Sequence, residues 1–436
     1  MPQSEERVSR ADAPDAPADG HRPHKPSLWR DRNFMTMWSG QALSQLGAQI
    51  TELAIPVLAV LLLSATEFEV GVLNAANFAA FLLVGLPAGA WIDRLRKRHV
   101  MIAADLVRAV ALAVVPVLWI LGALEIWHLI ALATVMGVAS VFFDVSYQSI
   151  VPSLVRSDQI AEANGKLQAT YEVANIAGPG IGGWLIGVIT APFAILATAG
   201  TYIVSAIALA FTRDREEPAH EEHLPLARSI AEGLRFIFTE KLLRRIVGTT
   251  AVGNFFNTIA TTLLPLFLLR DLGFTPQGLG LVFSLGAIGG LVGAIATPRL
   301  VAWLGEARSI ALSALGMSVI ALLLPVAAVV PAIAFPLVVA QWFVATFMVL
   351  MYNITQVTFR QRITPKRLLG RMNASVRFVV WGVMPIGALI AGGLGTWLGV
   401  IPTMWIAAVG QLLSCLFVVT GPFWTMRDLP DQHTNA

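Results

Sequence analysis

Charged residues are scarce in this 436-residue chain: 13% are Asp, Glu, Lys or Arg, whereas 56% are hydrophobic. A water-soluble protein of this length needs a larger charged fraction to cover its surface. The scarcity of charge therefore excludes an ordinary globular protein. It indicates that a lipid bilayer is the solvent for most of the chain.

Cysteine and enzyme signatures are also scarce. Cys415 is the only cysteine, and this excludes a disulfide framework and a cysteine metal site. We expect the protein to bind no cofactor and no metal. No GxSxG elbow or P-loop is present. The HEEH sequence at 220–223 spaces its histidines three residues apart, one fewer than a zinc-binding HExxH needs. The sequence thus favours a protein that is not an enzyme, with a membrane-embedded enzyme as an alternative.

Long apolar runs are what the chain has in abundance. A run of about 20 apolar residues crosses a bilayer as a helix, the form that satisfies its own backbone there. We therefore predict an all-α membrane protein with twelve transmembrane helices, each boundary uncertain by about four residues. The predicted spans are 33–63, 70–92, 100–121, 128–150, 168–190, 193–212, 243–269, 277–301, 308–330, 333–356, 372–397 and 401–421.

The basic residues indicate topology rather than a nucleic-acid partner. The net charge is +3, but the basic residues lie in short loops between apolar runs, so we expect no nucleic acid. Nearly all Lys and Arg fall on the side of the N-terminus, and Arg270 lies in a loop on the other side. This asymmetry predicts a multi-pass protein of the plasma or inner membrane with both termini cytoplasmic.

A charged segment at 213–241 divides the predicted spans into two groups of six. Within it Leu226, Ile230, Leu234 and Phe238 recur at helical spacing, which predicts an amphipathic helix along the inner membrane surface. The predicted domains are a disordered cytoplasmic tail (1–29), a six-helix bundle (30–212), this cytoplasmic linker (213–241), a second six-helix bundle (242–425) and a cytoplasmic tail (426–436).

The two groups of spans repeat in sequence. The segment from DVSYQ to GPGIGG can be read onto a segment in the second half that pairs Tyr147 with Tyr352 and Gly178 with Gly387. A degenerate match also pairs GAWIDRLRKR at 89–98 with GAIATPRLVA at 293–302. Matches separated by about half the chain predict parallel repeats, and hence two pseudo-symmetric six-helix bundles.

The loop after the second span carries a signature. Gly89, Asp93, Arg94, Lys97 and Arg98 match GxxxD(R/K)xGRR, with an arginine at position 96 where the second glycine is usual. This loop is similar to the signature loop of the major facilitator superfamily. Together with three further runs, FFDVSYQSIVPSLV, AEANGK and GPGIGG, it resembles in particular the branch that includes macrolide-efflux and enterobactin-export proteins.

The resemblance implies a fold and a function. Two bundles would rock about a midplane cavity and export a small amphipathic or lipophilic compound, drug-like, macrolide-like or siderophore-like, by proton antiport. The partners implied are a small-molecule substrate, protons and the lipid bilayer, and we expect a monomer. Import or uniport of a small metabolite is an alternative, as is a non-transporting sensor.

Charged groups in the signature loop predict a cytoplasmic latch. Carboxylate and guanidinium groups can pair in one packing of the two halves and separate in another. Two charges inside the third span would extend the latch, because a lone charge in a membrane costs about 2.5–3.5 kcal/mol and seeks a partner. A role in topology alone is the alternative. The latch candidates are Gly89, Asp93, Arg94, Lys97, Arg98, Asp105 and Arg108.

The fifth span contains GPGIGG, that is Gly178, Pro179, Gly180, Gly182 and Gly183 around Ile181. The motif also fits the GxGxxG dinucleotide fingerprint, but it begins inside an apolar run and follows no predicted strand. Small residues in a membrane helix permit close packing, and a proline permits a kink. The resemblance implies an exporter motif, and plain helix packing is the alternative.

Polar residues recur along four of the spans. In the first span Gln41, Gln45, Gln49 and Glu52 recur every three or four residues, which places them on one helical face. In the resembled fold the first, fourth, seventh and tenth helices surround the central cavity, whereas polar seams between helices are the alternative. The substrate-cavity candidates are Gln45, Gln49, Tyr147, Gln148, Asn254, Asn257, Gln341, Tyr352 and Gln356.

Glu52 and Asp144 are the proton-coupling candidates, because an ionisable residue at membrane depth predicts function. Desolvation favours a neutral carboxylic acid, whereas solvent or a nearby cation favours the anion. Alternating exposure can therefore couple proton entry to substrate exit. We expect Glu52 to be the main proton-responsive carboxylate. The fourth span lacks the arginine found in many proton-antiporting relatives, which leaves the coupling ion open.

Overall fold

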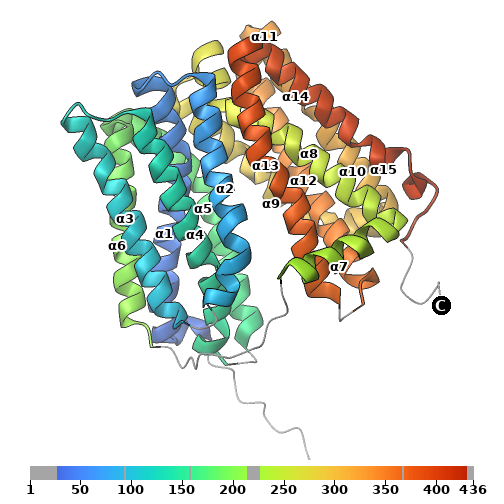
Figure 1. The fold of residues 1–436 in the computed structure, drawn as a ribbon, viewed down its shortest axis with the longest axis horizontal. Helices are drawn as coiled ribbons and strands as arrows, with labels where there is room; N and C mark the ends of the chain where they lie inside the picture. The colour runs from blue at the N-terminus through green and yellow to red at the C-terminus, as the bar shows by residue number, and fades with distance from the viewer. Residues whose placement is uncertain (1–26, 93–94, 157–158, 214–225, 366–367, 430–436) are drawn as a thin grey trace, which may run out of the picture.

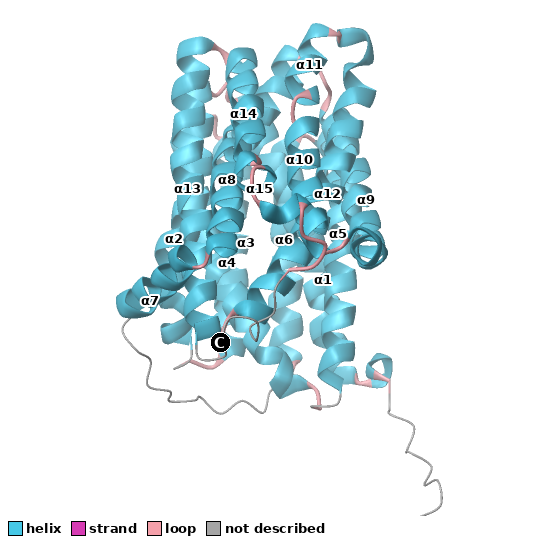
Figure 2. Ribbon diagram, turned by 90° about the vertical axis from the view of Figure 1, so that its right-hand side faces the viewer, coloured by secondary structure: helices cyan, strands magenta, loops and turns pink. Residues whose placement is uncertain are grey.

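The computed structural model describes residues 27–92, 95–156, 159–213, 226–365 and 368–429, and every regular element in these ranges is a helix (Figure 2). Within these ranges twelve helices are long and apolar enough to cross a membrane. This confirms the predicted all-α membrane fold with twelve spans. Most of the two predicted tails, and the HEEH sequence, lie outside the described residues.

The first six spans occupy the chain up to Phe211. After the short η1 (Leu28–Arg30), they are α1 (Arg32–Val57) with its π-helical extension η2 (Leu58–Leu62), α2 (Glu67–Ile92), α3 (Lys97–Ile120), α4 (Ile126–Leu154), α5 (Ile160–Ile189) and α6 (Ala191–Phe211). The helix α7 (Leu226–Thr239) precedes the second group.

The second six spans repeat this order. They are α8 (Lys241–Leu266) with its π-helical extension η4 (Phe267–Asp271), α9 (Pro276–Leu304), α10 (Glu306–Ile320) with α11 (Leu323–Val329), α12 (Ala334–Ile363) preceded by η5 (Pro331–Ile333), α13 (Leu369–Leu398), and α14 (Val400–Ser414) with α15 (Leu416–Val419). The short η7 (Pro422–Trp424) follows.

Helices of each group pack mainly on one another. In the first half α1 packs on α5 and α6, and α4 packs on α2 and α3; in the second half α12 packs on α9 and α10, and α8 packs on α13 and α14. The main contacts between the halves are α2 with α13 and α5 with α9. In Figure 1 the second-half helices slope away from the first six spans. The second helix of each half thus contacts the fifth helix of the other.

The repeat extends to backbone detail at the ends of α1 and α8. Pro56 and Pro265 each precede a π-helical segment by two residues. After that segment, Ser64 and Gly273 both adopt a positive φ, 52° and 65°. Pro265 follows Pro56 by 209 residues, and Gly273 follows Ser64 by the same number. The predicted internal repeat is therefore visible in the backbone at this turn.

The C-terminal ends of the odd-numbered spans gather at one end of the bundle, which we call the far end. The N-terminal ends of the same spans, and α7, lie at the opposite end, which we call the linker end (Figure 1). Near the far end, two glycine pairs bring the halves into close contact. A Cβ on Gly183 would lie 2.5 Å from the Pro276 carbonyl oxygen and 3.2 Å from the Cα of Gly280. A Cβ on Gly71 would lie 2.8 Å from the Cα of Gly392. A larger residue does not fit at these contacts without displacing a helix.

A hydrogen bond supplements these contacts at the far end. The guanidinium Nη2 of Arg270 donates to the carbonyl oxygen of Val60 over 3.0 Å. Both residues belong to the π-helical extensions of α1 and α8. Backbone contacts and this charged hydrogen bond therefore join the two halves at the far end.

The helix α7 runs across the ends of neighbouring spans (Figure 1) and packs on α13 and α8. Its contact is made through Gly233, where a Cβ would lie 2.4 Å from the Arg371 carbonyl oxygen, and through the buried Ile237. Glu232 also pairs with Arg371. Phe238, on the predicted apolar stripe, is 58% exposed. The predicted helix is therefore present, and it contacts the bundle through Gly233 and Ile237, which lie beside the predicted stripe.

Two helices extend well beyond their predicted bounds. The helix α5 begins at Ile160 rather than near 168, and α12 ends at Ile363 rather than near 356. The extra turns contain Asn164 and Lys166 in α5, and Arg360 in α12. Hydropathy marks where side chains become polar, not where the backbone leaves the helix, so these polar turns were missed.

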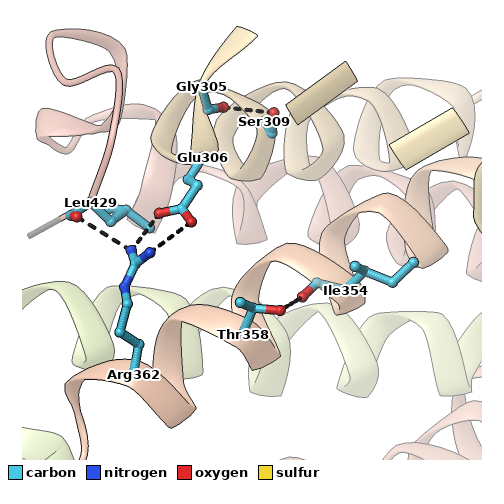
Figure 3. A network of polar contacts seen from close by, with 7 residues as sticks. All are labelled: Gly305, Glu306, Ser309, Ile354, Thr358, Arg362 and Leu429. Atoms are coloured by element: carbon cyan, nitrogen blue, oxygen red, sulfur yellow. Dashed lines mark hydrogen bonds and ion pairs between the residues drawn. The ribbon is translucent and has the colours of Figure 1, made fainter. Parts of the chain in front are cut away.

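At the linker end of the second half, the C-terminal segment docks on the turn between α9 and α10 (Figure 3). Arg362 donates to both carboxylate oxygens of Glu306, over 2.9 and 2.5 Å, and to the Leu429 carbonyl oxygen over 3.3 Å. The Ala307 N–H donates to the Arg427 carbonyl oxygen over 3.1 Å. One guanidinium thus joins α12, α10 and the C-terminal segment.

Candidate functional site

A central cavity of about 440 Å³ lies between the two halves. Helices α1, α2 and α5 line it on one side, and α8, α9 and α12 line it on the other. Its walls are aromatic and polar together, with Phe78, Tyr171, Phe283 and Trp342 among them. Among the described residues that line it, Glu52 alone carries a charged side chain. The cavity combines apolar surface with one carboxylate.

Two further cavities lie nearer the linker end than the central one. One, of about 540 Å³, lies between α1, α4 and α5 and shares Tyr171 with the central cavity. The other, of about 660 Å³, lies between α2, α4 and α13, and shares Asp144 and Gln148 with the second. We call them the α1–α5 cavity and the α4–α13 cavity. The central and α1–α5 cavities thus share one lining residue, and the α1–α5 and α4–α13 cavities share two.

A small side cavity of about 30 Å³ adjoins the central cavity inside the second half. Thr261, Leu264 and Trp342 line both. The side cavity is otherwise enclosed by residues of α8, α11, α12 and α14 and by the turn before α11. It therefore lies within the second half rather than between the halves.

The two proton-coupling candidates line different cavities. The Glu52 side chain is exposed in the central cavity. The Asp144 side chain is half-buried and faces both the α1–α5 and α4–α13 cavities. Tyr171, which lines two of the cavities, lies between them. The structure thus gives both carboxylates access to a cavity, at different depths.

Asp105 and Arg108 lie together inside the first half. The Arg108 guanidinium donates to an Asp105 carboxylate oxygen over 2.6 Å, and both side chains are buried. The guanidinium also lies over the rings of Phe143 and Tyr202, with its carbon 4.3 and 4.5 Å from their centroids. It interacts electrostatically with Asp144 as well. The pair therefore links α3 to α4 and α6 within one half.

The other latch candidates are only partly described. Asp93 and Arg94 lie outside the described residues, as does the side-chain environment of Gly89. Lys97 is buried at the start of α3. Arg98 donates to the Thr212 carbonyl oxygen over 2.6 Å, which ties the start of α3 to the end of α6. These bonds of Arg98 and of the Asp105–Arg108 pair stay within the first half.

The polar candidates separate into cavity and seam residues. Gln45 and Tyr147 line the α1–α5 cavity, Gln148 lines this and the α4–α13 cavity, Gln49 lines the central cavity, and Asn257 and Gln341 line the side cavity.

Three other candidates occupy seams in the second half. The Tyr352 hydroxyl is hydrogen-bonded to the Ile246 carbonyl oxygen over 3.1 Å, in the core of that half. Asn254 donates to the Val380 carbonyl oxygen over 3.3 Å, and Gln356 is 3% exposed. For these three residues the polar-seam alternative fits the structure better than the cavity prediction.

GPGIGG lies inside the continuous helix α5, as a packing motif requires, and not in a strand-to-helix turn. Gly178 and Gly182 face α1, where a Cβ on Gly178 would lie 2.4 Å from the Gln49 Cβ. Gly180 and Gly183 face α9, and the Gly180 N–H donates to the Ser284 hydroxyl over 2.8 Å. The motif thus holds α5 against both its own half and the other half.

Sequence reasoning missed Asn74, Tyr171 and Asn175, which all line the central cavity. The signal for two of them was present, because Tyr171 and Asn175 lie four residues apart on one face of α5. Gln411 of α14, which lines the side cavity, was missed as well. Within the described ranges, no group of three or more His, Cys, Asp or Glu could hold a metal ion.

Two curated proteins resemble the chain over most of its length. It is 27% identical to the "Multidrug efflux pump Tap" of Mycolicibacterium fortuitum, over 88% of this chain and 95% of that protein. It is 22% identical to "Macrolide efflux protein A" of Streptococcus pyogenes, over 88% of this chain and 94% of that protein. Both likenesses extend through the two halves.

Solved structures share the fold. An inward-facing bacterial homologue of the iron transporter ferroportin superposes with a TM-score of 0.69 at 16% identity, covering 92% of this chain and all of that one. The family model of the Major Facilitator Superfamily matches residues 37–385. With its twelve spans and the two repeated halves around a central cavity, the chain belongs to the Major Facilitator Superfamily.

Proposed function

We propose that the protein exports a small amphipathic or lipophilic compound in exchange for protons, by alternating access. One observation carries the proposal: the central cavity is lined from both halves and exposes the Glu52 carboxylate among aromatic side chains. Aromatic walls suit an apolar ligand, and a carboxylate supplies a site for a proton or a cation. The efflux activities for which the two relatives are named support the direction.

The orientation belongs to the same proposal. Basic residues concentrate at the linker end, so that end faces the cytoplasm, together with both terminal tails and the linker 213–241. The bundles 30–212 and 242–425 then move as two bodies about the central cavity. Contacts close the far end, and the α1–α5 and α4–α13 cavities lead toward the linker end. In this state a compound would enter from the cytoplasmic side.

Closure of the linker end and opening of the far end would complete the cycle. The equivalent crossings of α2 with α13 and of α5 with α9 provide two similar surfaces about which the halves can rock. Glu52 would lose its proton to one side and regain it from the other as its exposure alternates. Asp144, nearer the linker end and beside Arg108, would serve as the second proton-sensitive group.

Growth profiling across a panel of compounds tests the proposal. Cells that lack the gene are complemented with the wild type, an empty vector or the Glu52→Gln variant, and compared across macrolides, tetracyclines and lipophilic cationic dyes. We expect the wild type to raise tolerance to at least one compound severalfold, and Glu52→Gln to lose this gain at equal membrane abundance. Identical profiles for the wild type and the empty vector would contradict export.

A further inference from the structure

The side cavity holds two buried hydrogen-bond acceptors that lack a partner. Gln341 of α12 and Gln411 of α14 both line it, and they are 6% and 9% exposed. The Oε1 atom of each is buried without a hydrogen-bond donor. A buried polar atom left unpaired costs about 1–3 kcal/mol, so most such atoms in proteins find a partner. Two residues that line one small space thus each carry an unpaired acceptor, and this indicates a site for a donor group.

The walls of the side cavity restrict what that donor group can be. Phe256, Trp342 and Met404 supply apolar surface. The Thr261 hydroxyl donates to the Asn257 carbonyl oxygen over 3.0 Å, so its hydrogen is already used. No charged side chain is among the described residues that line the cavity. The lining therefore places the two acceptors beside apolar surface, without a fixed charge.

The size of the cavity restricts the group further. Its volume of about 30 Å³ has room for one amino or hydroxyl group, but not for a ring. Thr261, Leu264 and Trp342 line the central cavity too, so the two cavities adjoin at these side chains. One end of a compound in the central cavity would enter the side cavity past them. The body of the compound would then lie beside Phe283 and Trp342, with Glu52 facing it from the first half.

We propose that the side cavity is a specificity subsite for a hydrogen-bond-donating group of the transported compound, an amine or a hydroxyl, with Oε1 of Gln341 and Gln411 as the acceptors. The proposal rests on the proposed function, because it places the transported compound in the central cavity. It assigns Gln411 to compound selection, although that residue lies on a helix outside the four predicted to surround the cavity. A site that forms a hydrogen bond to a donor group binds compounds that lack this group more weakly.

Two matched dyes test the subsite by binding. Rhodamine 123 carries N–H groups at both ends of its planar ring system, and tetramethylrhodamine methyl ester carries N-methyl groups there with the same charge. Fluorescence anisotropy is measured on the purified full-length protein in lipid nanodiscs. We expect rhodamine 123 to bind about tenfold more tightly, as one well-placed hydrogen bond in a buried site allows. Equal affinities in the wild type would overturn the proposal.

Variants locate the preference. Gln411→Met keeps the length of the side chain and removes its acceptor, so it should bring the two affinities together by weakening only rhodamine 123. Gln341→Met should act in the same direction. The control is Gln356→Met, since Gln356 is also buried with an unpaired Oε1 but lines none of the four cavities. A preference that survives in both Gln411→Met and Gln341→Met would overturn the assignment.

Transport by the same protein separates this inference from the proposed function. The dyes are loaded into proteoliposomes, and a proton gradient is applied. Proton-driven movement of both dyes with equal affinity would support the function and refute the subsite. A binding preference that depends on Gln411, without proton-driven movement of either dye, would support the subsite and refute the proposed coupling.

Discussion

The guanidinium of Arg270 donates a 3.0 Å hydrogen bond to the carbonyl oxygen of Val60, and so joins the second half to the first at the far end. A hydrogen bond from a charged group contributes about 1.5–3 kcal/mol. Arg270→Ala should therefore shift the population toward the far-end-open state by about tenfold or more. Spin labels at the exposed Leu121 and Val329 report this as a longer distance.

The matched control for this change is Arg299→Ala, which removes an exposed arginine from the linker end of α9. It should leave the distance distribution unchanged. Identical distributions for Arg270→Ala and the wild type would show that the glycine contacts alone close the far end.

Neighbouring glycines in α13 provide a test of the helix contact itself. A Cβ at Gly392 would lie 3.0 Å from the Phe68 Cα, whereas a Cβ at Gly393 would meet no atom within 4 Å. Both changes to alanine raise helix propensity equally, but only Gly392→Ala forces α2 and α13 apart. We expect faster labelling of a cysteine at position 74 by an impermeant maleimide from the far side in Gly392→Ala. Equal rates for the two variants would contradict the contact.

The Asp105–Arg108 pair predicts a strong coupling in stability. Asp105→Leu leaves a buried guanidinium without its carboxylate, which typically costs about 3–5 kcal/mol. Asp105→Leu combined with Arg108→Met removes both charges and should recover most of that loss. Thermal unfolding in detergent measures all three variants against the wild type. A double variant no more stable than Asp105→Leu would show that the pair contributes through the ring contacts of Arg108 instead.

Arg362 should hold the C-terminal segment in place. Arg362→Gln breaks its bonds to Glu306 and to the Leu429 carbonyl oxygen (Figure 3). We expect faster hydrogen exchange at the Ala307 amide, because its acceptor is the Arg427 carbonyl oxygen in the docked segment. Thr358→Val is the control, since the Thr358 hydroxyl bonds only within its own helix turn. Unchanged exchange in Arg362→Gln would mean that buried Phe423 anchors the segment alone.

The fold was largely predictable from the sequence, because the bilayer imposes one secondary structure on every long apolar run. The spans and the repeat therefore followed from hydropathy and from matches such as Gly178 with Gly387. The ends of α5 and α12 did not, because their last turns carry polar residues and leave the apolar pattern.

The sequence predicted four of the helices that line the cavities, but it did not predict which of their polar residues do so. Polar periodicity places Gln49 and Glu52 on one face of α1, and that face does line a cavity. It could not separate Asn257, which lines the side cavity, from Tyr352, which bonds to the backbone of α8. A polar residue in a helix–helix contact and a polar residue in a cavity give the same sequence pattern. They differ only in whether the neighbouring helix supplies a hydrogen-bond partner.

We propose that a proton bound at Glu52 drives export through the central cavity. The most direct test uses everted membrane vesicles and a compound to which the wild type confers tolerance. Glu52→Gln is compared with Glu172→Gln, since Glu172 lies on α5 outside the four cavities and accepts a hydrogen bond from Gln168 over 2.8 Å. The account predicts that uptake collapses with the proton gradient in the wild type and in Glu172→Gln, and that Glu52→Gln shows no uptake driven by the gradient. Gradient-driven uptake by Glu52→Gln at the wild-type rate would contradict it.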